Sequence, residues 1–329
     1  MPTRRRALLI LATLIGLALL SVVLALMVGS IAVSATEVFS SLFNEGGGVA
    51  GDVVRKLRLP RALAGFACGG LLALAGALLQ ILLRNPLADP YVLGISGGAG
   101  VGAMLAILFG LSVAGVNGFA FLGALGTMLL VFGLAHGDVS WTQTRLLLTG
   151  VIVAAGCGAV VALMLSIAPE HKLRGMLFWL MGDLSQTSDP RLALGILALA
   201  LLVSLPFARE LNLLARGADT AQTLGVAVSR LRRGVYIVAS LATAAAVTHA
   251  GSIGFIGLIV PHLVRLATGN DQRLLLPASV LAGGSLLVIA DTLARTIVAP
   301  QQLPVGVLTA LIGVPVFLYL LTRDTRARR

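Results

Sequence analysis

The sequence predicts an all-α fold, a polytopic membrane bundle of about ten transmembrane helices. Apolar residues make up 58% of the 329 residues and charged residues only 11%, and the mean hydropathy is +1.01. A soluble domain carries about 25% charged residues, so these proportions exclude one. The apolar segments have roughly the 20 residues that a spanning helix needs, not the alternating stretches of about 10 that form barrel strands. Residues 1–329 are therefore expected to form one transmembrane domain.

The first element is expected to be a membrane helix that is not cleaved. Its basic start, Arg4 to Arg6, is also typical of a signal peptide, but the apolar run continues to about Val33 and no A-x-A site ends it. Hydrophobicity then predicts ten spans, of which the eighth is too short to cross alone: 7–33, 61–83, 92–109, 118–136, 145–168, 192–208, 235–249, 257–268, 275–297 and 306–322.

An even number of spans places both termini on the same side of the membrane. Three arginines begin the chain and four lie in its last seven residues. The positive-inside rule predicts that this side is the cytoplasm. The net charge of +11 comes mainly from segment ends that face anionic lipid, so it does not indicate nucleic-acid binding.

A stiff polar corner, RNPLADP at residues 84–90, separates the second and third spans. Asn-Pro and Asp-Pro both bias the residue before proline away from the helix, so the chain is expected to turn at the cytoplasmic end and re-enter. The following GISGGAGVGA lets other backbones approach the third helix closely. It is not a dinucleotide loop, because no strand precedes it and no acid is placed to bind a ribose.

Several catalytic and binding motifs are absent from the sequence. The two lysines, Lys56 and Lys172, do not follow glycine, so the chain has no Gly-Lys-Ser/Thr loop and is not itself an ATPase. The four histidines are scattered and no His-Glu-x-x-His occurs, so we expect no catalytic residue, no metal site and no cofactor. Asp291, four residues before Arg295, predicts an i,i+4 ion pair near the outer membrane face.

The cytoplasmic loop 209–233 carries five arginines and has the pattern of two short helices. Residues 210–215 are expected to form the first, and Asp219 to cap a second that ends at Leu224. Glycines are expected to stop both helices: Gly217 and Gly225. Apolar residues that a solvated basic loop does not need favour docking to a partner: Leu211, Leu213, Leu214 and Leu224.

With these features, the chain closely resembles the permease subunits of ABC importers for iron-siderophores, haem and cobalamin. The resemblance runs from about Arg58 to the C-terminus, whereas the first span and residues 34–57 carry little of it. Five blocks carry it, in the same order: RLPR (58–61), RNPLADPYVLGISGGAGVG (84–102), GADTAQTLGV (217–226), GSIGFIGLIVPHLVR (251–265) and LPVGVLTALIGVPVFLYLL (303–321).

The resemblance implies a homodimer around a central pathway. Two ATP-binding subunits would lie on the cytoplasmic face and supply the missing energy source, and a periplasmic substrate-binding protein would dock on the outer face. Residues 217–225 look like coupling helices that enter the ATPase, with Gly217, Asp219, Leu224 and Gly225 at the contact. Three arginines look like the outer residues that receive acids of the binding protein, although the first two could instead snorkel to lipid headgroups: Arg58, Arg61 and Arg295.

The RNPLADP corner is similar to the family's cytoplasmic gate. Asn85 and Leu87 would lie near the axis, faced by Gln143 and Thr144 at the start of the fifth span. Family members often carry a small hydroxyl residue where this chain has Gln143, so the width of the gate is left open.

These expectations describe a transporter subunit and not an enzyme. The chain would move a metal chelate or corrinoid inward, driven by ATP hydrolysis on separate subunits. The alternatives are an ion-coupled secondary transporter, and an intramembrane enzyme or assembly factor. The identity of the cargo is left open. A large chelate would be bound chiefly by the soluble partner, and the sequence has no haem-ligand spacing.

Overall fold

The computed structural model describes residues 4–29, 33–43, 48–135, 143–185 and 189–327, and these residues form helices and connections without a strand. Ten helices match the ten predicted spans: α1 (Arg4–Met27), α4 (Leu59–Leu82), α5 (Ile95–Leu108), α6 (Val113–Ala135), α7 (Gln143–Ile167), α9 (Arg191–Ser204), α12 (Val228–Ala250), α13 (Ile256–Thr268), α14 (Gln272–Thr296) and α15 (Val305–Ala327). Shorter elements connect them: α2 (Ala35–Phe43), α3 (Gly48–Asp52), a π-turn η1 (Val53–Arg58), the 3-10 turns η2 (Pro90–Leu93) and η3 (Leu205–Phe207), α8 (Glu170–Leu180), α10 (Ala208–Arg216) and α11 (Ala218–Thr223).

Length and composition divide nine of the ten predicted spans into two groups, and α12 belongs to neither. Six helical stretches among the described residues are long and apolar enough to cross a membrane, whereas α5, α13 and the first part of α15 are shorter apolar helices. The predicted eighth span is indeed short, with 13 residues in α13. Helix α8 was not predicted, because its Glu, His, Lys and Arg residues interrupt the hydropathy.

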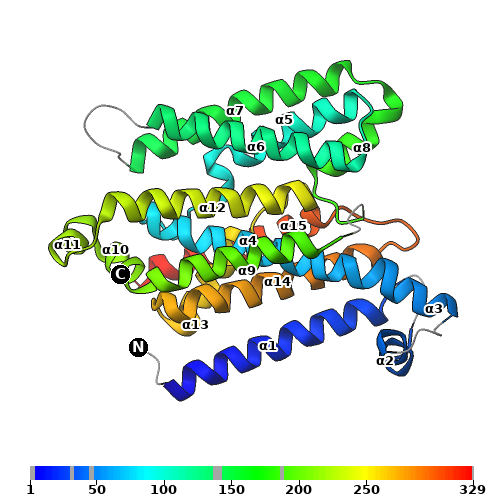
Figure 1. Cartoon of the computed structure of the whole chain (residues 1–329), viewed down its shortest axis with the longest axis horizontal. Coiled ribbons are helices and arrows are strands. Elements are labelled where there is room, and N and C mark those ends of the chain that lie inside the picture. Colours follow the sequence, from blue (N-terminus) through cyan, green and yellow to red (C-terminus); the bar gives the residue numbers. More distant parts are fainter. Residues whose placement is uncertain (1–3, 30–32, 44–47, 136–142, 186–188, 328–329) are drawn as a thin grey trace.

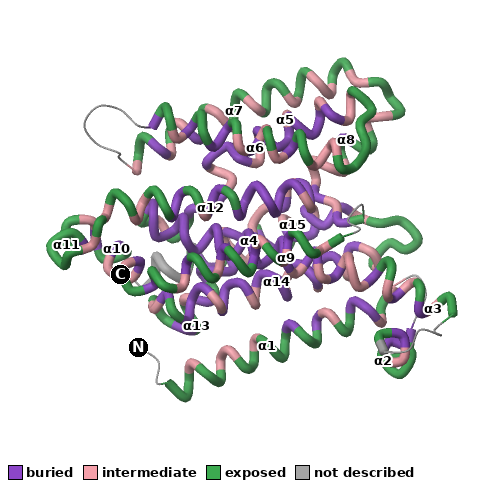
Figure 2. The backbone as a smooth tube through the Cα atoms, in the orientation of Figure 1, coloured by how far each residue is buried: buried purple, intermediate pink, exposed green. Residues whose placement is uncertain are grey.

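The helices pack as layers around α4. Figure 1 shows α5, α6, α7 and α8 together on one side of α12, and α1 on the far side of α14. In Figure 2 the buried backbone is concentrated in α4, α12 and α14, whereas α1 and α7 are mostly exposed. The start of α1 and the end of α15 lie at the end of the bundle that carries α10 and α11. We call this the α11 end.

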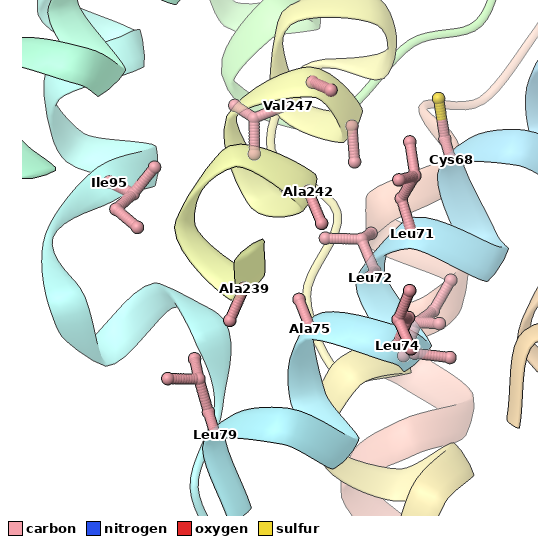
Figure 3. Packing of buried hydrophobic residues seen from close by; sticks show 14 of the residues in the cluster. Cys68, Leu71, Leu72, Leu74, Ala75, Leu79, Ile95, Ala239, Ala242 and Val247 are labelled. Carbon is pink, nitrogen blue, oxygen red and sulfur yellow. The ribbon is translucent and has the colours of Figure 1, made fainter. Parts of the chain in front are cut away.

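Glycines allow the close packing around α4. A Cβ on Gly76 would collide with the backbone of Gly257 in α13, and one on Gly69 would collide with Gly283 in α14. The predicted close approach of the third span is confirmed as well, because Gly98 of α5 lies directly against the Gly123 carbonyl of α6. Apolar side chains of α4 then meet those of α12, as Figure 3 shows for Leu72 and Ala242.

We expect that Gly76→Ala destabilises the protein, because the added methyl group meets backbone that cannot move aside. Overpacking of this kind costs about 1–3 kcal/mol, sometimes more. The matched control is Gly156→Ala in α7, where a Cβ meets no atom within 4 Å and alanine is the better helix former. The melting temperature of purified protein in detergent measures both. Equal melting temperatures for the two variants would contradict the packing argument.

Candidate functional site

The predicted corner between the second and third spans is confirmed as a tight polar turn at residues 83–89. Arg84 has a positive φ of 47°, which is unusual for a residue with a side chain. The Asn85 side-chain oxygen accepts the Leu87 N–H at 2.9 Å, and the Asp89 carboxylate accepts the Tyr91 N–H at 2.8 Å, which caps η2. These two short-range bonds fix the path of the chain, while the Leu87 side chain is left 39% exposed.

The start of α7 lies against this corner through Gln143. Its Nε2 donates to the carbonyl of Leu82, which is the last residue of α4, at 2.9 Å. Thr144, the second residue that the sequence placed here, is exposed. The structure therefore brings Gln143 to the corner through a backbone contact.

Tyr91 is a residue that the sequence reasoning missed. Its hydroxyl donates to the Ile253 carbonyl at 2.8 Å and accepts the Ile253 N–H at 2.7 Å. Ile253 lies in a non-helical segment, 251–255, between α12 and α13. One side chain thus satisfies both the N–H and the carbonyl of a residue outside any helix. Inside an apolar bundle such backbone groups need partners within the protein. The glycines of GSIGFIG, which break the helix pattern, are the sequence signal for this segment.

The same segment is hydrogen-bonded to the end of α8, where the Ser252 N–H donates to the Trp179 carbonyl at 3.4 Å. The Asp183 N–H donates to the Ala250 carbonyl at 2.9 Å, and the Val305 N–H donates to the Gly182 carbonyl at 3.0 Å. Gly182 has a φ of 81° and is packed against Ile253. Backbone bonds therefore connect the chain before α9, the end of α12 and the start of α15.

The three arginines that were predicted to face outward lie at the end opposite α11, with intramolecular partners. Arg58 is 5% exposed, and its Nη1 donates to the carbonyls of Leu26 and Met27 at 2.7 and 3.1 Å. These carbonyls lie in the last turn of α1, where a helix lacks donors of its own and favours cations.

Arg61 and Arg295 share one carboxylate. Arg61 binds both oxygens of Asp291 at 2.8–3.1 Å and also donates to Gln302 at 2.9 Å. The predicted i,i+4 pair of Asp291 and Arg295 is confirmed at 3.5 Å. Arg295 also donates to the Ala25 carbonyl at 3.1 Å, so the cluster ties α1, α4 and α14 together.

The predicted pair of short helices in the 209–233 loop is confirmed as α10 and α11, which project from the bundle in Figure 1. Gly225 has the expected positive φ, 85°, and α11 ends in a Schellman motif: the Gly225 N–H donates to the Gln222 carbonyl and the Val226 N–H to the Ala221 carbonyl, both at 3.0 Å.

Two details of this loop differ from the prediction. Asp219 is not the N-cap of α11; the cap is Gly217, whose carbonyl accepts the Ala221 N–H, and Asp219 lies in the first turn. Leu211 and Leu214 are not exposed for docking but buried in the core, because α10 is amphipathic and packs on the bundle. Leu224 is 62% exposed, so the apolar docking surface is smaller than predicted.

A large cavity opens at the end opposite α11, between α8 and the ends of α5 and α12. Its volume is about 910 Å³. Polar and aromatic side chains that the sequence reasoning did not single out line it, among them His171, Arg174, Trp179, Asp183 and His249. Among the described residues, no group of three or more His, Cys, Asp or Glu side chains could hold a metal ion.

Comparison with known proteins gives consistent relatives. The chain is 47% identical over 279 residues to the cobalamin import system permease protein BtuC of Halobacterium salinarum, covering 84% of this chain and 74% of the relative. It is 41% identical over 283 residues to the hemin transport system permease protein HmuU of Yersinia pestis, covering 83% and 84%. A solved metal-chelate type ABC transporter in an inward-facing conformation matches with a TM-score of 0.86 at 33% identity, covering 95% of this chain and 99% of the other.

A family model extends this likeness to nearly the whole chain. It matches residues 14–323 and so includes the greater part of the first helix, which the quoted sequence blocks left out. The glycine-packed bundle, the broken segments around Tyr91 and the projecting α10–α11 pair all lie within the matched region. The chain belongs to the FecCD transport family.

Proposed function

We propose that the chain is the transmembrane permease subunit of an ATP-driven ABC importer that carries a metal chelate or a corrinoid inward. The observation that carries this proposal is the α10–α11 pair, which projects from the α11 end of a bundle whose sequence has no phosphate-binding loop. Membership of the FecCD family and the metal-chelate transporter of the same fold support it. Cobalamin and hemin, which the relatives' names give, belong to the proposed cargo class, as do iron-siderophores.

The proposed assembly is a homodimer with two cytoplasmic ATP-binding subunits and a periplasmic substrate-binding protein. Helix α7 supports a partner within the membrane, since only 11% of its most apolar window is buried within one chain. The α11 end would face the cytoplasm of a bacterial inner membrane, because the arginines of the first turn of α1 and of loop 209–233 gather there.

Coupling would pass through the exposed tip of the α10–α11 pair. Leu224 offers an apolar contact to the ATPase, and Asp219 carries an exposed charge beside it. The buried face of α10 fixes this tip to the bundle through Leu211 and Leu214. A movement of the ATPase would therefore be transmitted to α10 as a rigid element and from there to α4 and α14, which α10 contacts.

The corner 83–89 would act as the cytoplasmic gate. Leu87 is its exposed apolar residue, Asn85 holds the turn, and Gln143 joins it to α7, with Thr144 exposed next to it. Tyr91 ties the same corner to segment 251–255, which is bonded to the chain at the opposite end. A displacement of the corner would thus be transmitted through Tyr91 and segment 251–255 to the end of the bundle opposite α11.

Arg58, Arg61 and Arg295 would serve binding-protein docking as a shared positive cluster. Two guanidinium groups, those of Arg61 and Arg295, bind the one carboxylate of Asp291, whereas Arg58 binds carbonyls of α1, so the four side chains together keep a formal charge of +2. An acidic residue of the binding protein would be attracted by this excess even though each arginine has a partner within the chain. The same contacts disfavour an ion-coupled carrier, because this carboxylate already has two guanidinium partners within the chain.

Gly225→Val is expected to spare membrane insertion and to impair coupling. Valine cannot easily adopt the positive φ of the Schellman motif, so the α11 tip would be distorted. We expect lower co-purification of the ATPase subunit, or a smaller rise in ATP turnover when loaded binding protein is added. Gly234→Val in α12 is the control, since this glycine has no positive φ and no atom near its Cβ position.

Full ATPase assembly together with undiminished stimulated turnover in Gly225→Val would remove α10–α11 from the coupling site. Uptake by reconstituted wild-type vesicles that persists without ATP and collapses with the proton gradient would overturn the proposed function itself.

Leu87→Ala is expected to change the leak or the ATP-dependent uptake of chelate in liposomes without changing expression or melting temperature. The side chain is partly exposed, so its loss removes little packing but widens the proposed constriction. Leu202→Ala, at a 67% exposed position of α9, is the matched control and should behave as wild type. A variant at Leu87 that transports and leaks as wild type does would exclude this residue from the gate.

Arg61→Gln and Asp291→Asn should separate docking from structure. Breaking the buried pair from either side costs about 3–5 kcal/mol of stability, so both variants should melt at lower temperature. Close interfacial charge pairs are worth about 2–5 kcal/mol, so Arg61→Gln should weaken docking of the binding protein by about 30-fold or more. Asp291→Asn frees two guanidinium groups and should maintain or strengthen docking. Equal losses of docking in the two variants would show a purely structural cluster.

A further inference from the structure

A second large hollow lies at the α11 end of the bundle, where it shares Arg84 and Pro86 with the corner 83–89. Its volume is about 840 Å³, and it lies between the start of α1, the end of α4, α10 and the turn from α13 to α14. Basic side chains dominate its charged lining: Arg6, Arg84, Arg216 and Arg265. We call it the arginine hollow.

The described residues supply little negative charge to this hollow. Asp271 is the one acid among the described lining residues, and its Oδ1 already accepts hydrogen bonds from the Asn212 side chain at 2.9 Å and the Arg273 N–H at 3.1 Å. The salt bridges between described residues include none from Arg84, Arg216 or Arg265. Arg265 instead donates to the neutral Gln80 side chain at 3.0 Å. Three guanidinium groups, those of Arg84, Arg216 and Arg265, thus line one concave surface without a salt bridge to a described acid, an arrangement that favours an external anion.

The depth of the hollow matches the phosphate layer of a membrane. Arg6 is two residues from the start of α1, Gln80 two residues from the end of α4, and Arg265 three residues from the end of α13. At 1.5 Å per residue, all three lie within about 5 Å of a helix end. Figure 1 shows α11 projecting further out than these helices.

The lining also contains apolar surface at the same depth. Leu266, next to Arg265, is 62% exposed, and Ile81 is part of the same wall. A carboxylate from a soluble protein would meet only the charged part of such a site. A phospholipid would meet both parts, with its phosphate at the arginines and the first carbons of its chains at the leucine.

We propose that the arginine hollow binds the phosphate headgroup of an anionic phospholipid from the leaflet at the α11 end. Guanidinium groups bind phosphate oxygens in a bidentate way, which makes arginine suited to this role. The bound lipid would bridge α1, which is otherwise mostly exposed, to α10 and α13. This inference concerns lipid binding alone and does not depend on what the protein transports.

The test compares a two-charge variant with a matched control. Arg84→Gln/Arg216→Gln removes two exposed arginines of the hollow, whereas Arg209→Gln/Arg233→Gln removes two exposed arginines of the 209–233 loop that do not line it. Detergent-purified proteins are titrated with phosphatidylglycerol or phosphatidylcholine of the same chains. Native mass spectrometry counts the retained lipid, and the melting temperature reports stabilisation.

Wild type and the control pair should retain phosphatidylglycerol in preference to phosphatidylcholine and should melt higher with it. The hollow variant should bind phosphatidylglycerol about 30-fold more weakly, given the usual contribution of each basic residue near anionic lipid. Added salt should reduce the preference in wild type. If the double variant does not fold, the single variant Arg216→Gln should show about a 5-fold loss.

Three results would overturn the proposal. Equal retention of the two lipids by wild type would show that no anionic headgroup is selected. If inorganic phosphate alone raises the melting temperature as much as phosphatidylglycerol does, the hollow is a site for a free anion. Unchanged lipid binding by the hollow variant, together with loss of the ATPase subunit on co-purification, would make the hollow a protein-docking surface.

Discussion

Non-helical backbone inside an apolar bundle must find hydrogen-bond partners within the protein, and this requirement organises the structure. Segment 251–255 connects α12 to α13, and its central residue, Ile253, lies outside both helices. Tyr91 supplies one donor and one acceptor to Ile253, and backbone groups near Gly182 bind its neighbours. Because Tyr91 follows the corner 83–89 directly, the bonds that stabilise the broken segment also fix the position of the proposed gate. Stability and the proposed gating thus depend on the same side chain.

Close helix packing at glycines is the second requirement of the bundle. Helix α4 can lie against α13 and α14 only because Gly76 and Gly69 have no side chain. Van der Waals contact at such short separation replaces the hydrophobic driving force, which is weak between helices in lipid. The outer helices α1 and α7 have less of this contact, with 11% of their apolar windows buried. At these two helices, lipid or a second subunit can supply the contacts that neighbouring helices supply in the core.

Features that depend on local sequence could be predicted, and features that depend on distant contacts could not. Hydropathy located the helices, proline bias located the corner at 84–90, and the need for a positive φ located Gly225. The Tyr91–Ile253 bond joins residues 162 positions apart and has no local pattern. Leu211 and Leu214 seemed free for docking because an amphipathic helix does not reveal what its apolar face covers. The roles of the predicted site residues remain predictions, although the structure places Gln143 at the corner.

The arginine cluster has a consequence for how the chain is assembled in the membrane. Arg58 can bind the last carbonyls of α1 soon after synthesis, because its partners are 31 and 32 residues away. Arg61, in contrast, must wait for Asp291, which is synthesised 230 residues later. Until α14 has entered the bilayer, the start of α4 carries a cation without its carboxylate, so the end of the bundle opposite α11 closes late. The contacts of this cluster are therefore expected to form in two stages. Arg58 joins α1 to the start of α4 early, and Arg61 finds its carboxylate only when α14, the ninth predicted span, has been inserted.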